Sequence, residues 1–202
     1  MTNGSDLWNP GQMEQILSRT MKHEGGFVDD PADSGGATNY GISLRFLQGL
    51  GDSDADGILD GDIDRDGDVD ADDVTKMTRA QAAVFYVEKI GKPLQLSRIP
   101  GIRLRWKLFD LAVNMGQKRA VKILQSVVGV AEDGILGDQT IAALIAQRDQ
   151  LNTASSRVAD QLILFNLARA QVLFYRQISQ GKNLKFLRAW IWRAMDTADD
   201  LV

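Results

Sequence analysis

The residues best suited to acid–base chemistry lie near the N-terminus, where Glu24 is followed by two glycines and then by Asp33 and Thr38. Apolar residues at helical spacing precede Glu24, so we expect it to close the first helix. Because a helix macrodipole places partial negative charge at the C-terminal end, we expect the pKa of Glu24 to be raised. A general acid that works near neutral pH needs such a shift. Gly25 and Gly26 carry no side chains, so a bulky polymer can approach the carboxyl group closely.

The spacing from Glu24 to Asp33 and on to Thr38 suits hydrolysis of a glycosidic bond with inversion. That reaction needs an acid on one side of the bond and a water-activating group on the other, with the two carboxyl groups roughly 6.5–9.5 Å apart. A helix-end glutamate and an aspartate on the returning loop can meet this geometry, with Thr38 helping to hold the water. The alternative for Asp33 and Thr38 is a turn in which their side chains bond to nearby backbone. The sequence leaves both roles open for these two residues.

The wider segment resembles the signature of glycoside hydrolase family 108, which comprises N-acetylmuramidases found as bacteriophage endolysins and secreted lysozyme-like proteins. The resemblance implies that Glu24 is the catalytic residue and that Tyr40 lines a sugar subsite. The Glu-x8-Asp-x4-Thr spacing also resembles that of phage-type lysozymes, with one residue fewer before the threonine. The matching residues are Glu24-Gly25-Gly26-Phe27 and Asp30-Pro31-Ala32-Asp33-x-Gly35-Gly36-Ala37-Thr38-x-Tyr40-Gly41-Ile42.

The resemblance continues downstream into the family's peptidoglycan-binding portion. It is carried by Phe109-Asp110-Leu111-Ala112-Val113-Asn114-Met115-Gly116, by Leu124-Gln125, and by Asp133-Gly134-x-x-Gly137-Asp138-x-Thr140. Asn114 is a candidate for hydrogen-bonding a sugar or its acetamido group. The alternative is that Asn114 supports the helix end at Gly116, and the sequence does not choose between these roles.

An acidic insertion at 51–74 has the ligand spacing of an EF-hand-type calcium loop, with glycine at the sixth position. Its oxygen donors would be Asp62, Asp64, Asp66, the backbone carbonyl of Asp68, Asp70 and, in the closing twelfth position, Asp73. A partial copy, with Ile63 in its twelfth position, holds Asp52, Asp54, Asp56 and Asp60 as an open second site. Carboxylates this close repel one another unless a cation neutralises them. We expect a structural Ca²⁺ ion and no cofactor for catalysis; the alternative is a solvated acidic loop without metal.

Helical spacing, caps and stop residues predict a mainly α, lysozyme-like helical fold with at most a small β-hairpin, placed around Thr38 to Ile42. We expect one compact unit made of an N-terminal muramidase region (1–100) and a helical peptidoglycan-binding region (101–202). The first predicted helix runs from Pro10 to the Gly25-Gly26 stop, and others run over Ser43–Leu50 and from the Thr78 cap to Ile90, with a short helical stretch starting at Val74. Apolar residues from Leu104 to Met115 mark a helix that ends at Gly116, and those from Val121 to Val128 mark one that ends at Gly129. The last three helices run from an N-cap at Asp138 to about Arg148, over roughly Ala154–Gln180, and from Asn183 to about Ala198.

The charge distribution is uneven along the 202 residues, whose formal net charge is -4. The segment from Asp52 to Asp73 holds 11 of the 27 acidic residues and one of the 23 basic ones, which leaves 16 acidic and 22 basic residues elsewhere. The net charge gives no reason to expect nucleic acid as a partner. No apolar run approaches the ~20 residues of a membrane span, and no secretory h-region follows Met1. The absence of cysteine excludes disulfides and thiolate metal sites.

These features together predict a monomeric N-acetylmuramidase (a lysozyme-type glycoside hydrolase) that cleaves the β-1,4 bond between N-acetylmuramic acid and N-acetylglucosamine in bacterial peptidoglycan. We expect synthesis in the cytoplasm and action on the cell wall after release through a holin or by dedicated export. Two alternatives stay open. A lytic transglycosylase would use one glutamate to form an anhydro sugar, and a non-catalytic, calcium-dependent wall-binding module would not depend on Glu24.

Overall fold

The computed structural model describes residues 10–23, 27, 36–53, 55–151, 155–179, 184 and 186–201. The chain divides into two compact units, one of residues 17–88 and one that combines residues 89–202 with the N-terminal 16. The division falls within the first helix, α1 (Pro10–His23), directly after Ile16. The boundary expected from the sequence, after residue 100, falls within the second unit and stays a prediction.

The smaller unit holds a two-stranded antiparallel sheet and short helices. In the sheet, β1 (Thr38–Asn39) pairs with β2 (Ile42–Ser43), so that Thr38 lies opposite Ser43 and Asn39 opposite Ile42. The chain continues through α2 (Leu44–Gln48), the acidic loops, α3 (Ala71–Lys76) and α4 (Arg79–Phe85), which leads into a π-helical segment (Tyr86–Gly91) that enters the larger unit.

Gly61 lets the acidic segment run against α2. A Cβ atom at this position would lie 2.6 Å from the carbonyl oxygen of Leu47, which is closer than real Cβ contacts come. The neighbour is backbone and cannot swing aside, so a side chain at residue 61 would push the acidic loops away from α2.

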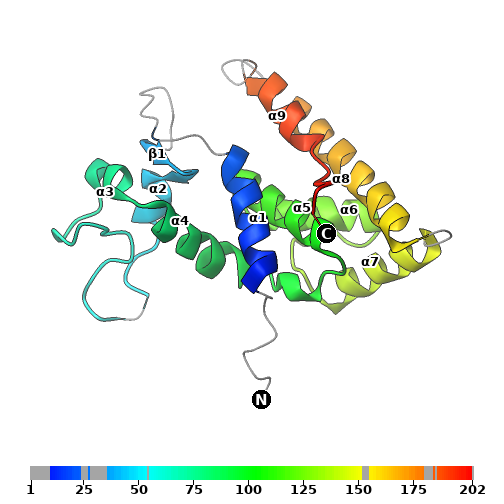
Figure 1. Ribbon diagram of the computed structural model, residues 1–202, viewed down its shortest axis with the longest axis horizontal. Coiled ribbons are helices and arrows are strands. Elements are labelled where there is room, and N and C mark those ends of the chain that lie inside the picture. The colour runs from blue at the N-terminus through cyan, green and yellow to red at the C-terminus, as the bar shows by residue number, and fades with distance from the viewer. Residues whose placement is uncertain are drawn as a thin grey trace. The chain divides into compact units, whose positions relative to one another are not determined.

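The larger unit is a helical bundle built around one central helix. After a 3₁₀ turn (Leu96–Arg98), α5 (Ile102–Met115) is buried on nearly every side, and α6 and α8 pack against it. In Figure 1, α7 lies near the start of α8 and α9 near its end. The remaining helices are α6 (Gln117–Val128), α7 (Asp138–Leu151), α8 (Ser156–Ile178) and α9 (Leu187–Ala194).

The polar residues of α5 form one seam that holds the C-terminal segment. Arg103 donates to the carbonyl oxygen of Thr197 at 3.0 Å and also bonds Asp199. Lys107 Nζ donates to the carbonyl oxygen of Ala194 at 2.8 Å. A helix buried all round normally carries apolar residues. Here the charges of Arg103 and Lys107 are tolerated because each side chain donates to a backbone carbonyl oxygen of the C-terminal segment.

The mainly α, lysozyme-like fold with one small hairpin is confirmed. Several element bounds differ from the prediction, and α7, for example, runs on to Leu151. The helix after Thr78 widens into a π-helix at Tyr86, and α3 begins at Ala71, before Val74, because Asp70 caps it. The last helix ends at Ala194 because Lys107 takes up its terminal carbonyl group, a contact that local sequence does not reveal. Within the described parts of the chain, no helix is both long and apolar enough to span a membrane.

Candidate active site and acidic loops

Two of the predicted catalytic residues, Glu24 and Asp33, lie outside the described residues. Described elements lie on both sides of these two residues along the sequence. On one side α1 ends at His23, directly before Glu24, and on the other the hairpin begins at Thr38, five positions after Asp33. In the sequence, Glu24 and Asp33 therefore lie between a helix C-terminus and a β-hairpin.

The hairpin carries two of the predicted site residues, Thr38 and Tyr40. Thr38 Oγ1 lies 3.4 Å from the carbonyl oxygen of Gly36, which is a long hydrogen bond. Tyr40 sits in the turn with a φ of 49°, a left-handed conformation that is uncommon for residues other than glycine. Its carbonyl oxygen accepts a hydrogen bond of 2.7 Å from the hydroxyl of the buried Tyr86. Tyr86, at the start of the π-helical segment, thus fixes the turn that presents Tyr40.

Asn39 ties the hairpin to the helix that follows the acidic loops. Its side chain is buried, and Nδ2 donates to the carbonyl oxygen of Val74 at 3.0 Å and lies 3.4 Å from that of Met77. These carbonyls are at the C-terminal end of α3, which leaves its last carbonyl groups without helical partners. The amide of Asn39 satisfies them. The position of the hairpin therefore depends on the position of α3.

The loop from Asp62 to Asp73 is closed by its own carboxylates. Asp62 accepts from the backbone N–H groups of Asp66 at 3.1 Å and Gly67 at 3.0 Å. Asp73, which is 1% exposed, accepts from Ile63 at 2.6 Å and from Asp70 at 2.8 Å. Asp73 thus joins the first and last turns of the loop and completes the capping box of α3.

The ligand residues predicted from the sequence gather in two groups of three. The oxygen atoms of each group lie within 4.8 Å of one another, and the groups are Asp62, Asp64, Asp66 and Asp68, Asp70, Asp73. Oxygen-only donors at this spacing suit a hard divalent cation. The negative charge of Asp66, followed by burial, raises the pKa of Asp68. Lys76 bonds Asp64 and lowers the pKa of that carboxyl group, so it acts as a local counter-charge.

The preceding loop repeats the backbone geometry of this one. Asp52 accepts from the N–H groups of Asp56 at 3.2 Å and Gly57 at 2.9 Å, as Asp62 does from the corresponding residues. The fourth residues of the loops, Ala55 and Arg65, have φ values of 60° and 62°. Asp60, a candidate ligand of this preceding loop, accepts a hydrogen bond from Ser53 Oγ at 2.6 Å. Asp54, also a candidate ligand of this loop, lies outside the described residues.

Asn114 lies in the larger unit, at the end of α5. Its Nδ2 donates to the carbonyl oxygen of Asp110 at 3.2 Å and lies 3.5 Å from Asp110 Oδ2. Asp110 is fully buried and pairs with Arg193 of α9 at 2.8 Å. These contacts give Asn114 a part in the polar seam of α5. Its predicted role in sugar binding stays a prediction.

Gln125 organises the turn after α6, a role that the sequence pattern alone did not assign. Its Nε2 donates to Asp133 Oδ1 at 2.6 Å and to Thr140 Oγ1 at 3.1 Å, while its Oε1 accepts from the N–H of Gly134 at 2.9 Å. Gly134 has a φ of 80°, and a Cβ atom there would lie 2.6 Å from Lys118 Cγ. The Asp-Gly-x-x-Gly-x-x-Thr pattern is thus explained by packing around a buried glutamine.

Comparison with known proteins assigns the two portions of the chain separately. Residues 17–116 match the family model of glycosyl hydrolase 108, and residues 119–195 match the model described as a predicted peptidoglycan domain. The structure of SagA from Brucella abortus is similar, with 28% sequence identity, a TM-score of 0.70, and coverage of 92% of this chain and 91% of that one. No match was found among curated protein sequences.

Proposed function

The two matched regions support a glycoside hydrolase that acts on peptidoglycan, and on that premise we propose that the protein is an N-acetylmuramidase with Glu24 as its general acid. The bond cleaved would be the β-1,4 linkage between N-acetylmuramic acid and N-acetylglucosamine. The observation that carries the proposal is the place of Glu24 directly after α1, within the region matched to the hydrolase family. A helix C-terminus disfavours the ionised form of a neighbouring carboxyl group, and a general acid needs its pKa shifted in that direction.

In the proposed reaction, Glu24 protonates the oxygen of the leaving sugar. Asp33, assisted by Thr38, activates the water that attacks the anomeric carbon from the opposite face. Tyr40 and Asn114 are each proposed to line a sugar subsite. The hydrogen bond from Tyr86 to the Tyr40 carbonyl supports this arrangement, since it holds the hairpin turn in a conformation that is otherwise uncommon for tyrosine.

The acidic loop supports a structural Ca²⁺ ion as part of the same proposal. Asp62, Asp64, Asp66, Asp70 and Asp73, with the Asp68 carbonyl, would hold the ion. The loop passes directly into α3, and the amide of Asn39 connects α3 to the hairpin. Ordering of the loop by calcium would therefore steady the strand that carries Thr38. The sugar chemistry itself needs no metal.

The biological role that fits this activity is lysis of a bacterial cell wall, as in endolysins. The enzyme would meet its substrate outside the cytoplasm, after release through a holin or by a dedicated export system.

The proposal is tested by incubating purified peptidoglycan with the full chain and with Glu24→Gln, and by analysing the released fragments by mass spectrometry. The expected result is reducing-end N-acetylmuramic acid from the wild type, and a rate about 10²–10⁴-fold lower for Glu24→Gln. Glu14→Gln is the matched control, because Glu14 is an exposed residue of the same helix. It should keep wild-type activity.

Two other results would each replace the proposal with a different function. Anhydro-muramic acid as the product would identify a lytic transglycosylase. If Glu24→Gln and wild type both bound the wall and neither released sugar fragments, the protein would be a wall-binding module.

A further inference from the structure

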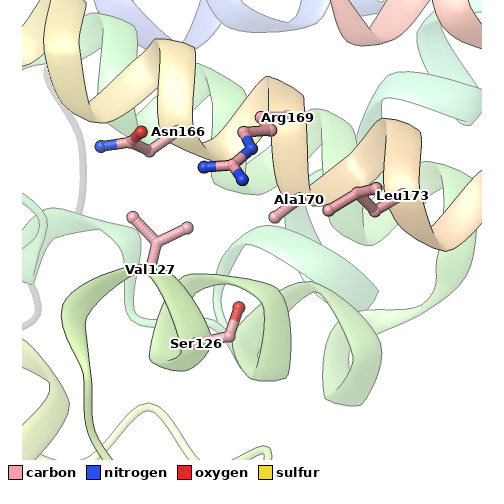
Figure 2. Close-up of a pocket in the computed structure, with 6 residues that line it drawn as sticks. All are labelled: Ser126, Val127, Asn166, Arg169, Ala170 and Leu173. Atoms are coloured by element: carbon pink, nitrogen blue, oxygen red, sulfur yellow. The ribbon is translucent and has the colours of Figure 1, made fainter.

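A groove of about 330 Å³ runs between the last turns of α6 and the middle of α8, in the region matched to the peptidoglycan domain (Figure 2). We propose that this groove binds the stem peptide of peptidoglycan through its carboxylate groups, with Arg169 as the anion-binding residue. The lining residues are Ser126, Val127, Asn166, Arg169, Ala170 and Leu173. This volume is within the range of ligand-binding clefts.

The polar side of the groove has hydrogen-bonding capacity that the fold does not use. Arg169 has no carboxylate partner among the residues that the structure describes, whereas Arg148 and Arg193 of the same unit pair with aspartates. In Figure 2 the guanidinium of Arg169 and the hydroxyl of Ser126 face the space between the helices. Ser126 Oγ donates to the carbonyl oxygen of Ile123 at 2.8 Å, which leaves its lone pairs free to accept. A guanidinium binds a carboxylate with two parallel hydrogen bonds.

The apolar side of the groove favours an anion that also carries aliphatic groups. Val127, Ala170 and the 48% exposed Leu173 present aliphatic surface beside the guanidinium. The stem peptide offers carboxylates separated by the methyl groups of alanine residues, so it can fill both sides at once. A glycan strand offers mainly hydroxyl and acetamido groups, which do not need a guanidinium, and the lining residues include no aromatic ring on which a sugar could stack.

This inference rests on the proposed function, because it takes peptidoglycan as the polymer that the protein meets. It adds a contact to the peptide part of that polymer, made by residues outside the region that holds Glu24 and Asp33. Cleavage occurs in the glycan, so peptide recognition would place the enzyme on wall segments that carry intact stems.

The test uses the full chain with Glu24→Gln, so that binding is measured without turnover. The probe is the free stem pentapeptide, titrated by calorimetry against this protein and against versions that also carry Arg169→Ala or Arg176→Ala. Arg176 is an exposed arginine of α8 that does not line the groove, and it serves as the control. Loss of Arg169 should weaken pentapeptide binding about tenfold or more. Arg176→Ala should leave it unchanged, and a pentapeptide with amidated carboxyl groups should bind weakly to every version.

Several outcomes would overturn the inference. Equal pentapeptide affinities with and without Arg169 would remove the groove as the binding site. Inorganic phosphate binding more tightly than the peptide would point to a phosphate-bearing wall polymer, and an Arg169-dependent affinity for an N-acetylglucosamine tetramer would point to a glycan subsite.

Failure of the proposed function would look different. With Glu24 intact, Arg169→Ala should raise the KM for peptide-bearing wall and leave turnover of peptide-free glycan unchanged. If the wild type cleaved no glycan at all while the pentapeptide still bound through Arg169, the muramidase proposal would fail and the groove assignment would stand.

Discussion

At the scale of single residues, the larger unit contains a buried lysine, Lys107, whose pKa is lowered. Lys107 is fully buried in α5, and burial lowers its pKa to about 8, although the nearby Asp110 and Asp196 act in the opposite direction. Its Nζ nevertheless donates to the carbonyl oxygen of Ala194. The hydrogen bond fixes the end of α9, and the desolvation of the ammonium group costs stability at neutral pH.

This balance predicts a pH dependence of stability. Between pH 8 and about 10.5 the unfolded chain keeps the Lys107 proton and the folded chain releases it, so the free energy of unfolding rises with pH by up to about 3 kcal/mol across that window. The Lys107→Met variant has no titrating group at this position, so its free energy of unfolding should lack this rise. Urea unfolding at several pH values, followed by circular dichroism, should show the wild type gaining stability relative to the variant from pH 8 upward. Parallel stability curves would contradict the burial of a titrating lysine.

Residue types and spacing predicted which acidic residues would lie close together, but not the other partners of these residues. The acidic spacing correctly brought together Asp62, Asp64 and Asp66. It did not show that Asp73, the proposed closing ligand, also binds the backbone at both ends of the loop. For Asn114 the structure adds a contact to Asp110 within the same helix. The proximity of Asp110 to Arg193 comes from tertiary packing, which no local pattern encodes.

At the scale of elements, local signals located several helix ends. Thr78 and Gln81 form the predicted capping box, and α7 begins at Asp138, the residue predicted as its N-cap. The C-cap of α6 is Gly129, in the left-handed conformation with a φ of 73°. These ends are set by side chains within a few residues of the backbone that they cap. The π-helical widening at Tyr86 was not predicted. Tyr86 bonds a turn 46 residues away, and that partner is invisible to a local pattern.

The link between α3 and the hairpin gives a prediction at this scale. Asn39→Ala leaves the buried carbonyl oxygens of Val74 and Met77 without their amide partner, and this should lower the free energy of unfolding by about 1–3 kcal/mol. It should also separate calcium binding from activity. Calcium would still bind to the loop, as measured by calorimetry, but would no longer increase the rate of peptidoglycan cleavage.

Thr75→Ala is the matched control for this variant, since the exposed Thr75 hydroxyl donates to the carbonyl oxygen of Ala71 within α3 and has no other hydrogen bond to the residues that the structure describes. It should leave both calcium binding and its effect on the rate intact. A calcium effect on cleavage that survives Asn39→Ala would show that the hairpin is positioned without α3.

At the scale of the whole molecule, the charge is divided between an acidic segment and a basic remainder. Residues 52–73 hold 11 aspartates and one arginine, and the rest of the chain has 22 basic and 16 acidic residues. A cell wall that carries carboxylates should attract the remainder and repel the acidic segment. Calcium bound in the loop would cancel part of this repulsion, so the ion would influence wall binding as well as loop structure.

This argument predicts that calcium increases wall binding in a salt-dependent way. The Glu24→Gln protein, sedimented with purified peptidoglycan in ~0.1 M salt, should bind more with calcium than with a chelator. In ~1 M salt, where screening acts within about 3 Å, the difference should disappear. Asp66→Asn should abolish the calcium effect, because it removes a proposed ligand. Asp72→Asn removes the same charge from an exposed residue outside the proposed ligand set and should preserve the effect. A calcium effect that persists in ~1 M salt would mean that the ion acts by ordering the loop, because screened charges no longer repel the wall.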